Sequence, residues 1–174
     1  MAREALRYLQ NAKEILRKAP VEDGRYADVY PERSRRVKYV QEACGVAYLA
    51  VLKAIDEYLL NKGVSKKELP KSIDGYRGAL QKYLAVRDGK LVREFESLYE
   101  ELHIAGYYRA LLVHVDMVKD ALKAAKGFIE KIKSTHSTPR SEARGMLRVD
   151  TERRFLPRFK NRGLAPSNVS TTIP

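Results

Sequence analysis

Three kinds of residue are scarce in this chain of 174 residues: it has one cysteine, Cys44, no tryptophan and three histidines. A single cysteine can form neither an internal disulfide nor a cysteine-rich zinc site. Long apolar runs are also missing, because the longest, residues 43–52, stops at Lys53 and a membrane span needs roughly 18 such residues. The N-terminus carries no apolar signal core. The sequence therefore predicts a soluble, cytoplasmic protein without a membrane segment.

Acidic residues are outnumbered, since 34 Lys and Arg face 22 Asp and Glu, and the formal charge is +12. An excess of this size favours contact with polyanions through phosphate neutralisation and counterion release. Hydrophobic residues make up 44% of the chain, which is enough to build a core and excludes wholesale disorder.

Apolar residues recur at helical spacing through most of residues 1–133. We expect a first helix that stops before Pro20, and a long, broadly apolar second helix that stops at Gly63. A shorter helix should follow, capped by the Ser72 hydroxyl. A turn at Asp88-Gly89 should separate it from a fourth helix, which Gly106 should end.

The fifth helix is expected to begin near Tyr108 and to bury Leu111, Val115, Val118, Leu122, Ala125, Ile129 and Ile132. The fold class is therefore predicted to be all-α: an antiparallel bundle of four long helices plus one shorter helix. Residues 20–36 read as an irregular insertion, and residues 134–174 as a basic, poorly structured C-terminal extension. Both stretches are interpreted either as translated repetitive DNA carried as a passenger or as nucleic-acid-binding arms.

Motifs for common chemistry are absent. The chain has no phosphate-binding Gly-x-x-x-x-Gly-Lys loop, no dinucleotide fingerprint and no Gly-x-Ser-x-Gly elbow. Glu100 and His103 match one Glu-x-x-His motif, but a di-metal bundle site needs a second copy. Cys44 is interpreted as a small core residue. We therefore expect neither a metal nor a cofactor.

The best catalytic candidates are Arg109 and His114 in the segment Arg-Ala-Leu-Leu-Val-His. An arginine can neutralise a phosphate and a histidine can transfer a proton at neutral pH, which together suffice for metal-independent RNA cleavage. On one regular helix the two side chains would point about 140° apart. They can converge only if Arg109 precedes the helix or if two subunits combine their motifs. Otherwise Arg109 faces solvent and His114 flanks the core.

Tyr107 and Tyr108 stand directly before Arg109. Exposed tyrosines beside basic residues can stack on bases, so these three residues are the nucleic-acid-binding candidates. Tyr8, Tyr48, Tyr76 and Tyr83 are instead expected to pack with their hydroxyl groups at the edge of the bundle.

The order of these features resembles the HEPN superfamily of helical bundles. The first helix pattern Ala5-Leu-x-Tyr8-Leu-x-x-Ala12, the long second helix from Tyr39 and the Arg-x-x-x-x-His segment carry the likeness. The segment Tyr99-Glu-Glu-Leu-His103-Ile is similar to a small family of uncharacterised bacterial helical proteins. One departure concerns Ala110, because the catalytic pattern of the superfamily usually has a polar residue there.

The resemblance implies three functions. The preferred one is a non-catalytic or regulatory interaction module, a homodimer or higher oligomer in contact with RNA. The second is a toxin-like endoribonuclease using Arg109 and His114, paired with a nucleotidyltransferase-type antitoxin. The third is a purely structural, oligomerising bundle.

Overall fold

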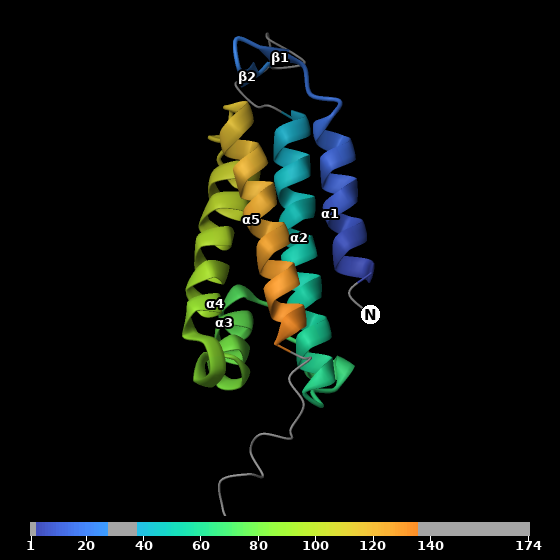
Figure 1. Ribbon diagram of the computed structural model, residues 1–174, viewed down its shortest axis with the longest axis vertical. Helices are drawn as coiled ribbons and strands as arrows, with labels where there is room; N and C mark the ends of the chain where they lie inside the picture. Colours follow the sequence, from blue (N-terminus) through green and yellow to red (C-terminus); the bar gives the residue numbers. More distant parts are fainter. Residues whose placement is uncertain (1–2, 28–37, 136–174) are drawn as a thin grey trace, which may run out of the picture. The chain divides into compact units, whose positions relative to one another are not determined.

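The computed structural model describes residues 3–27 and 38–135. The long helices of this part are α1 (Arg3–Leu16), α2 (Lys38–Asn61), α4 (Ala85–Leu98) and α5 (Val115–Ser134). Shorter elements complete it: strands β1 (Val21–Glu22) and β2 (Arg25–Tyr26), the 3-10 turn η1 (Lys66–Glu68), helix α3 (Ile73–Tyr83) and the π-helix η2 (Tyr99–Tyr108). Because η2 continues α4 directly, the prediction of four long helices and one shorter helix is confirmed (Figure 1).

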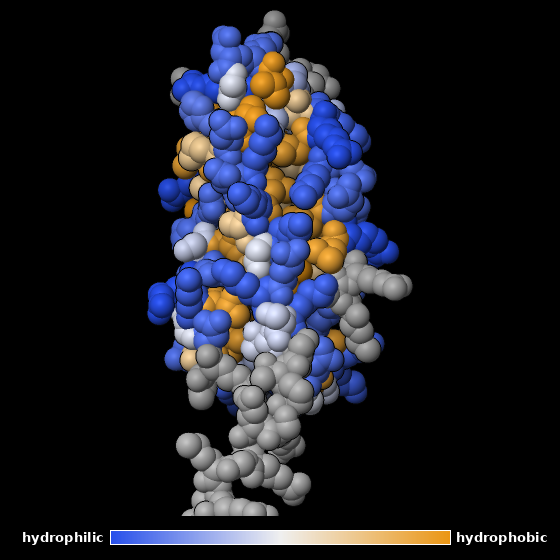
Figure 2. Space-filling model, in the orientation of Figure 1, coloured by the Kyte–Doolittle hydropathy of each residue, from blue (hydrophilic) through white to orange (hydrophobic). Residues whose placement is uncertain are grey.

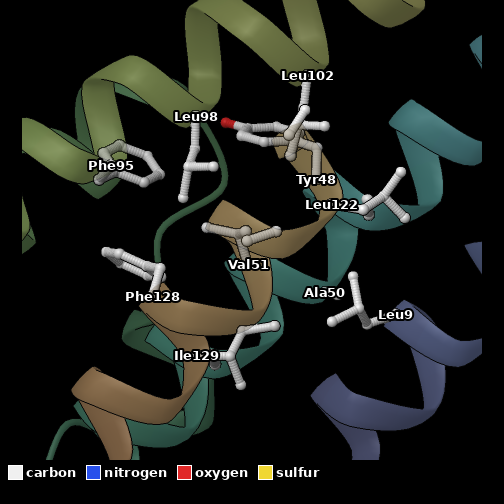
Figure 3. Close-up of a cluster of buried hydrophobic side chains, with 14 of the residues drawn as sticks. Leu9, Tyr48, Ala50, Val51, Phe95, Leu98, Leu102, Leu122, Phe128 and Ile129 are labelled. Carbon is white, nitrogen blue, oxygen red and sulfur yellow. The ribbon is translucent and has the colours of Figure 1, made fainter. Parts of the chain in front are cut away.

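Helix α2 lies at the centre and contacts α1, η2 and α5 (Figure 1). Its breadth of contact follows from its sequence, since small residues recur along it and let the neighbouring helices approach: Ala43, Ala47, Ala50 and Ala54 are all buried. Figure 3 shows Leu9, Val51 and Ile129 in the core between α1, α2 and α5, with Phe128 facing Phe95 of α4. Every buried residue of the described part is apolar, which is the arrangement that stabilises an amphipathic bundle. None of the described helices has the length and apolarity of a membrane span.

Local signals placed several helix ends correctly. The Ser72 hydroxyl accepts a hydrogen bond from the Gly75 N–H at 3.2 Å, as predicted for the cap of α3. Helix α2 ends at Asn61 and Gly63 has φ +89°, a left-handed conformation that costs glycine little. The break near Asp88 is a kink within α4, where Asp88 has φ −151° and ψ 81° and its carboxylate accepts from the Lys90 N–H.

The predicted boundary between the fourth and fifth helices was wrong. Gly106 lies buried inside η2, and the helix continues to Tyr108. Helix α5 begins only at Val115, so Leu111 is 61% exposed and does not belong to the core stripe. The periodicity misled because Leu112, one residue later, is the buried side chain of the segment that joins η2 to α5.

The sequence analysis also missed a hairpin in the stretch predicted to be irregular. Strands β1 and β2 pair antiparallel around Asp23 and Gly24, which have φ +47° and +73° and form the two-residue loop that a right-twisted hairpin favours. Asp-Gly is itself a hairpin signal. The rest of the predicted insertion (28–36) and most of the predicted tail (136–174) lie outside the described residues, so their roles stay predictions.

Candidate nucleic-acid interface

The candidate site lies where the hairpin, the end of η2 and the start of α5 meet, which we name the hairpin end (Figure 1). Two backbone hydrogen bonds join these elements. The Tyr26 N–H donates to the Val113 carbonyl at 2.8 Å, and the Val115 N–H donates to the Gly24 carbonyl at 3.1 Å. Together with the Tyr26 side chain, which is buried in the core, they hold the hairpin against the first turn of α5.

Arg109 and His114 both lie outside regular helix. Arg109 follows η2, and its N–H donates to the Ile104 carbonyl at 2.9 Å. His114 has the extended dihedrals φ −77° and ψ 132° and precedes the first turn of α5. Between them Ala110 adopts φ +53°. Both side chains are exposed. The alternative in which Arg109 faces solvent and His114 flanks the core is therefore right about Arg109 and wrong about His114. The divergence that a continuous helix would impose on the two side chains does not arise.

A third basic residue joins them, which the sequence analysis did not nominate. Arg25 of β2 forms a β-bridge with His114, and its side chain is exposed. The hairpin signal at Asp23-Gly24 could have identified the turn, but not its partner. The surface is not purely basic, because the exposed Asp116 lies in the first turn of α5.

Tyr107 and Tyr108 differ in how firmly they are held. The Tyr107 ring covers Gly45 so closely that a Cβ there would come within 2.9 Å of it. The Tyr107 carbonyl accepts a hydrogen bond from the Gln41 side chain at 2.8 Å. Tyr107 still keeps 47% of its surface exposed, and Tyr108 keeps 76%. The pair thus offers one anchored and one projecting aromatic ring next to Arg109.

His103, the histidine of the Glu-x-x-His motif, belongs to an aromatic cluster that includes Tyr107. It stacks on Tyr99 and Tyr107, with centroids 5.5 and 5.8 Å apart, and lies 4.9 Å from the Tyr48 ring. Glu100 is exposed. Across the described residues, no group of three or more His, Cys, Asp or Glu side chains is arranged to hold a metal ion.

Cys44 is fully buried, as predicted for a small core residue. Burial raises the pKa of its thiol to about 12, with a further contribution from Glu101. A thiol that stays protonated at neutral pH is a poor nucleophile. The four tyrosines predicted to pack also do so: Tyr48 and Tyr76 are buried, and Tyr8 and Tyr83 are half-buried.

A comparison with models of known protein families finds a match. A family model described as a domain of unknown function (DUF5618) matches residues 1–134. The chain belongs to this family. A DUF5618 match over the whole described bundle confirms the predicted kinship with a small uncharacterised family, and the family description states no function.

Solved structures support the same fold for this DUF5618 member. A protein of unknown function from Dyadobacter fermentans is 34% identical, with a TM-score of 0.60, and the match covers 77% of this chain and 94% of that one. A crystal structure of a protein from Sulfolobus solfataricus, 16% identical with a TM-score of 0.55, covers 75% of this chain and 94% of that one. At that identity the likeness concerns the fold alone. No curated protein matches the chain.

Proposed function

We propose that this protein is a non-catalytic interaction module that binds single-stranded RNA at the hairpin end through Tyr107, Tyr108 and Arg109. The observation that carries the proposal is the exposure of Tyr108, 76% of whose surface faces solvent beside an exposed arginine. Stacking of a base on this exposed aromatic ring lowers the free energy of the complex, and the guanidinium can neutralise the adjoining phosphate.

The neighbouring groups support this assignment. Arg25 and His114 add two exposed nitrogen-bearing side chains next to each other across the β-bridge. The anchored Tyr107 offers a ring whose position is already fixed, which lowers the entropy lost on binding. The net charge of +12 favours association with a polyanion.

The proposal includes the wider kinship and the assembly expected from it. We infer a HEPN-like bundle that acts as a homodimer or higher oligomer, with a nucleotidyltransferase-type protein as a candidate partner. Two further exposed apolar side chains at the hairpin end, Leu111 and Met117, support an interface there, since clustered apolar surface marks interaction sites.

A second candidate function is metal-independent RNA cleavage by Arg109 and His114. The position of both residues outside regular helix favours it, because this meets the geometric condition that the spacing imposes. His114 would take the proton of a 2′-hydroxyl, whose oxygen attacks the adjacent phosphorus and forms a 2′,3′-cyclic phosphate, while the 5′-oxygen leaves and takes a proton from water. Arg109 would stabilise the charge on the phosphoryl oxygens. Ala110 remains the departure from the catalytic pattern.

Binding of a fluorescent single-stranded RNA tests the module. Tyr108→Ala should weaken binding about 5- to 150-fold, the equivalent of about 1–3 kcal/mol per stacked base. Leu49→Ala in α2 is the control, because it removes an exposed apolar side chain that cannot stack and that has no place in the proposed site. If both variants bind the RNA as tightly as the wild type does, the proposal that Tyr108 stacks on RNA is refuted.

The same RNA, incubated in the presence of a chelator, tests the enzyme. Cleavage that His114→Ala abolishes while RNA binding persists would establish catalysis. An intact RNA after incubation with the wild type would exclude it.

A further inference from the structure

A second basic feature lies away from Tyr108, in a groove between α1 and α5. Its volume is about 430 Å³. Two leucines, Leu16 and Leu122, line it, and the remaining lining residues are all cationic: Lys13, Arg17, Lys119, Lys123 and Lys126. We name this feature the α1–α5 groove. Figure 2 shows hydrophobic surface between hydrophilic side chains on the face where α5 lies in front.

Most of these cations are uncompensated. Lys126 pairs with Glu130 at 3.6 Å. Lys13, Arg17, Lys119 and Lys123 make no ion pair within the part of the chain that the structure describes. Asp116 and Asp120 are exposed on α5 nearby, yet neither lines the groove. Four unpaired cations side by side repel one another, so an anion that binds among them relieves this repulsion.

The positions of the cations follow from helix geometry. Lys119, Lys123 and Lys126 lie on successive turns of α5 and span about 10 Å along its axis. Lys13 and Arg17 stand one turn apart at the end of α1, which faces α5. The charges thus form two short rows on either side of an apolar floor.

We propose that the α1–α5 groove holds the phosphates of a single-stranded nucleic acid. Every polar group that lines it is a donor, because lysine and arginine side chains have no acceptor. Phosphodiester groups present charged acceptors at regular intervals, and the groups themselves carry no donors. An acidic peptide would also bring backbone N–H groups, for which the leucine floor offers no acceptor.

The inference rests on the proposed function and extends it, because Arg17 and Lys119 of the groove lie at the ends of α1 and α5 that are nearer the hairpin. Arg17 lies just beyond α1, and the chain then enters the hairpin that bonds to Val115. Lys119 is on the first turns of α5, after His114. A strand with bases at Tyr107 and Tyr108 therefore has a second, purely electrostatic binding surface within reach on the same bundle.

The test compares two full-length variants that lose the same charge. Lys119→Gln/Lys123→Gln neutralises the groove, and Lys66→Gln/Lys67→Gln neutralises two exposed lysines of η1, at the end of α2 remote from the hairpin (Figure 1). Affinity for a single-stranded RNA is measured between about 50 and 200 mM salt. Thermal unfolding followed by circular dichroism verifies that both variants fold.

The groove variant loses two phosphate contacts, and each contributes about 0.7 to the slope of log affinity against log salt for single strands. We therefore expect the slope to become shallower by about 1.4. At 0.1 M salt, relative to 1 M, this corresponds to about 25-fold weaker binding. The η1 variant should keep the wild-type slope. Equal slopes for the two variants would overturn the proposal.

A strand without bases separates the groove from the stacking site. The groove variant should lose affinity for both the abasic strand and the RNA, whereas Tyr108→Ala should lose affinity for the RNA alone. If Tyr108→Ala has no effect but the groove variant does, the stacking proposal fails and the groove stands. If the protein binds neither the RNA nor the abasic strand, the groove proposal fails. It also fails if the groove variant binds polyglutamate more weakly than the wild type but binds both nucleic acids as tightly.

Discussion

Gly106 of η2 lies against Cys44 of α2 so closely that a Cβ on residue 106 would come within 2.7 Å of the Cys44 Sγ. The same Cβ would meet the Cys44 Cβ at 2.8 Å and a Leu112 methyl group at 3.2 Å. The glycine therefore serves close packing of two helices and does not terminate one. Since η2 leads directly to Arg109, this contact also fixes the position of Arg109 along α2.

Gly106→Ala should lower the free energy of unfolding by about 1–3 kcal/mol, because the added methyl group overpacks the contact between η2 and α2. Urea unfolding measures the change. Gly127→Ala in α5 is the matched control, since a Cβ there meets nothing within 4 Å, and it should stabilise the protein by about 0.5–1 kcal/mol. Equal effects of the two substitutions would contradict the close approach.

The stability of the protein should decline in alkaline solution. Burial raises the pKa of Cys44 from 9.0 to about 12 and that of Tyr48 from 10.0 to about 12. Between these values the unfolded chain has released protons that the native state retains, so stability falls as pH rises above about 9. Each group alone contributes a slope of up to about 1.4 kcal/mol per pH unit.

Urea midpoints at successive pH values above 8 measure this decline, and Cys44→Ala should make its first part shallower. Alkylation gives an independent reading, because the native thiol should react far more slowly at pH 8 than the unfolded one. Similar alkylation rates in both states would show that Cys44 is accessible.

Arg77→Lys should lower the stability of the protein slightly. The guanidinium donates to both carboxylate oxygens of Glu96, each at 2.9 Å, and to Asp74 at 3.0 Å, and it lies 5.3 Å from the Tyr99 ring. A lysine can reproduce neither the paired hydrogen bonds nor the planar contact. Thermal unfolding detects the loss, and Arg93→Lys, at an exposed position of α4, should change nothing.

Val115→Pro should release the hairpin and leave α5 intact. Proline is favoured in the first turn of a helix, and the extended dihedrals of His114 suit a residue before proline. The substitution removes the N–H that donates to the Gly24 carbonyl. Amide hydrogen exchange at Tyr26 should quicken at least tenfold, while global stability changes by less than about 1 kcal/mol.

The comparison variant is Val115→Ala, which shortens the side chain and keeps the N–H. If the Tyr26 amide exchanges at the same rate in both variants, the Gly24 hydrogen bond does not hold the hairpin to α5.

Much of the candidate site could be anticipated residue by residue, but its arrangement could not. Tyr107, Tyr108, Arg109 and His114 stood out by residue type and adjacency. Arg25 was missed because its neighbour His114 is remote in sequence, and only the hydrogen bonds of the hairpin bring them together. The groove was missed for the same reason, since Lys13 and Lys119 meet only once α1 packs against α5.

The sequence by itself determined the helical bundle, the broad burial of α2, the Ser72 cap and the stop at Gly63. These features depend on periodicity and on hydrogen bonds between residues a few positions apart, so short stretches of sequence are enough to predict them. Tertiary structure alone decided that Gly106 lies inside a π-helix and that α5 begins only at Val115. The reason is physical: a π-helix is rare and is not signalled by local sequence, so its presence here depends on packing against α2, where Gly106 lies close to Cys44.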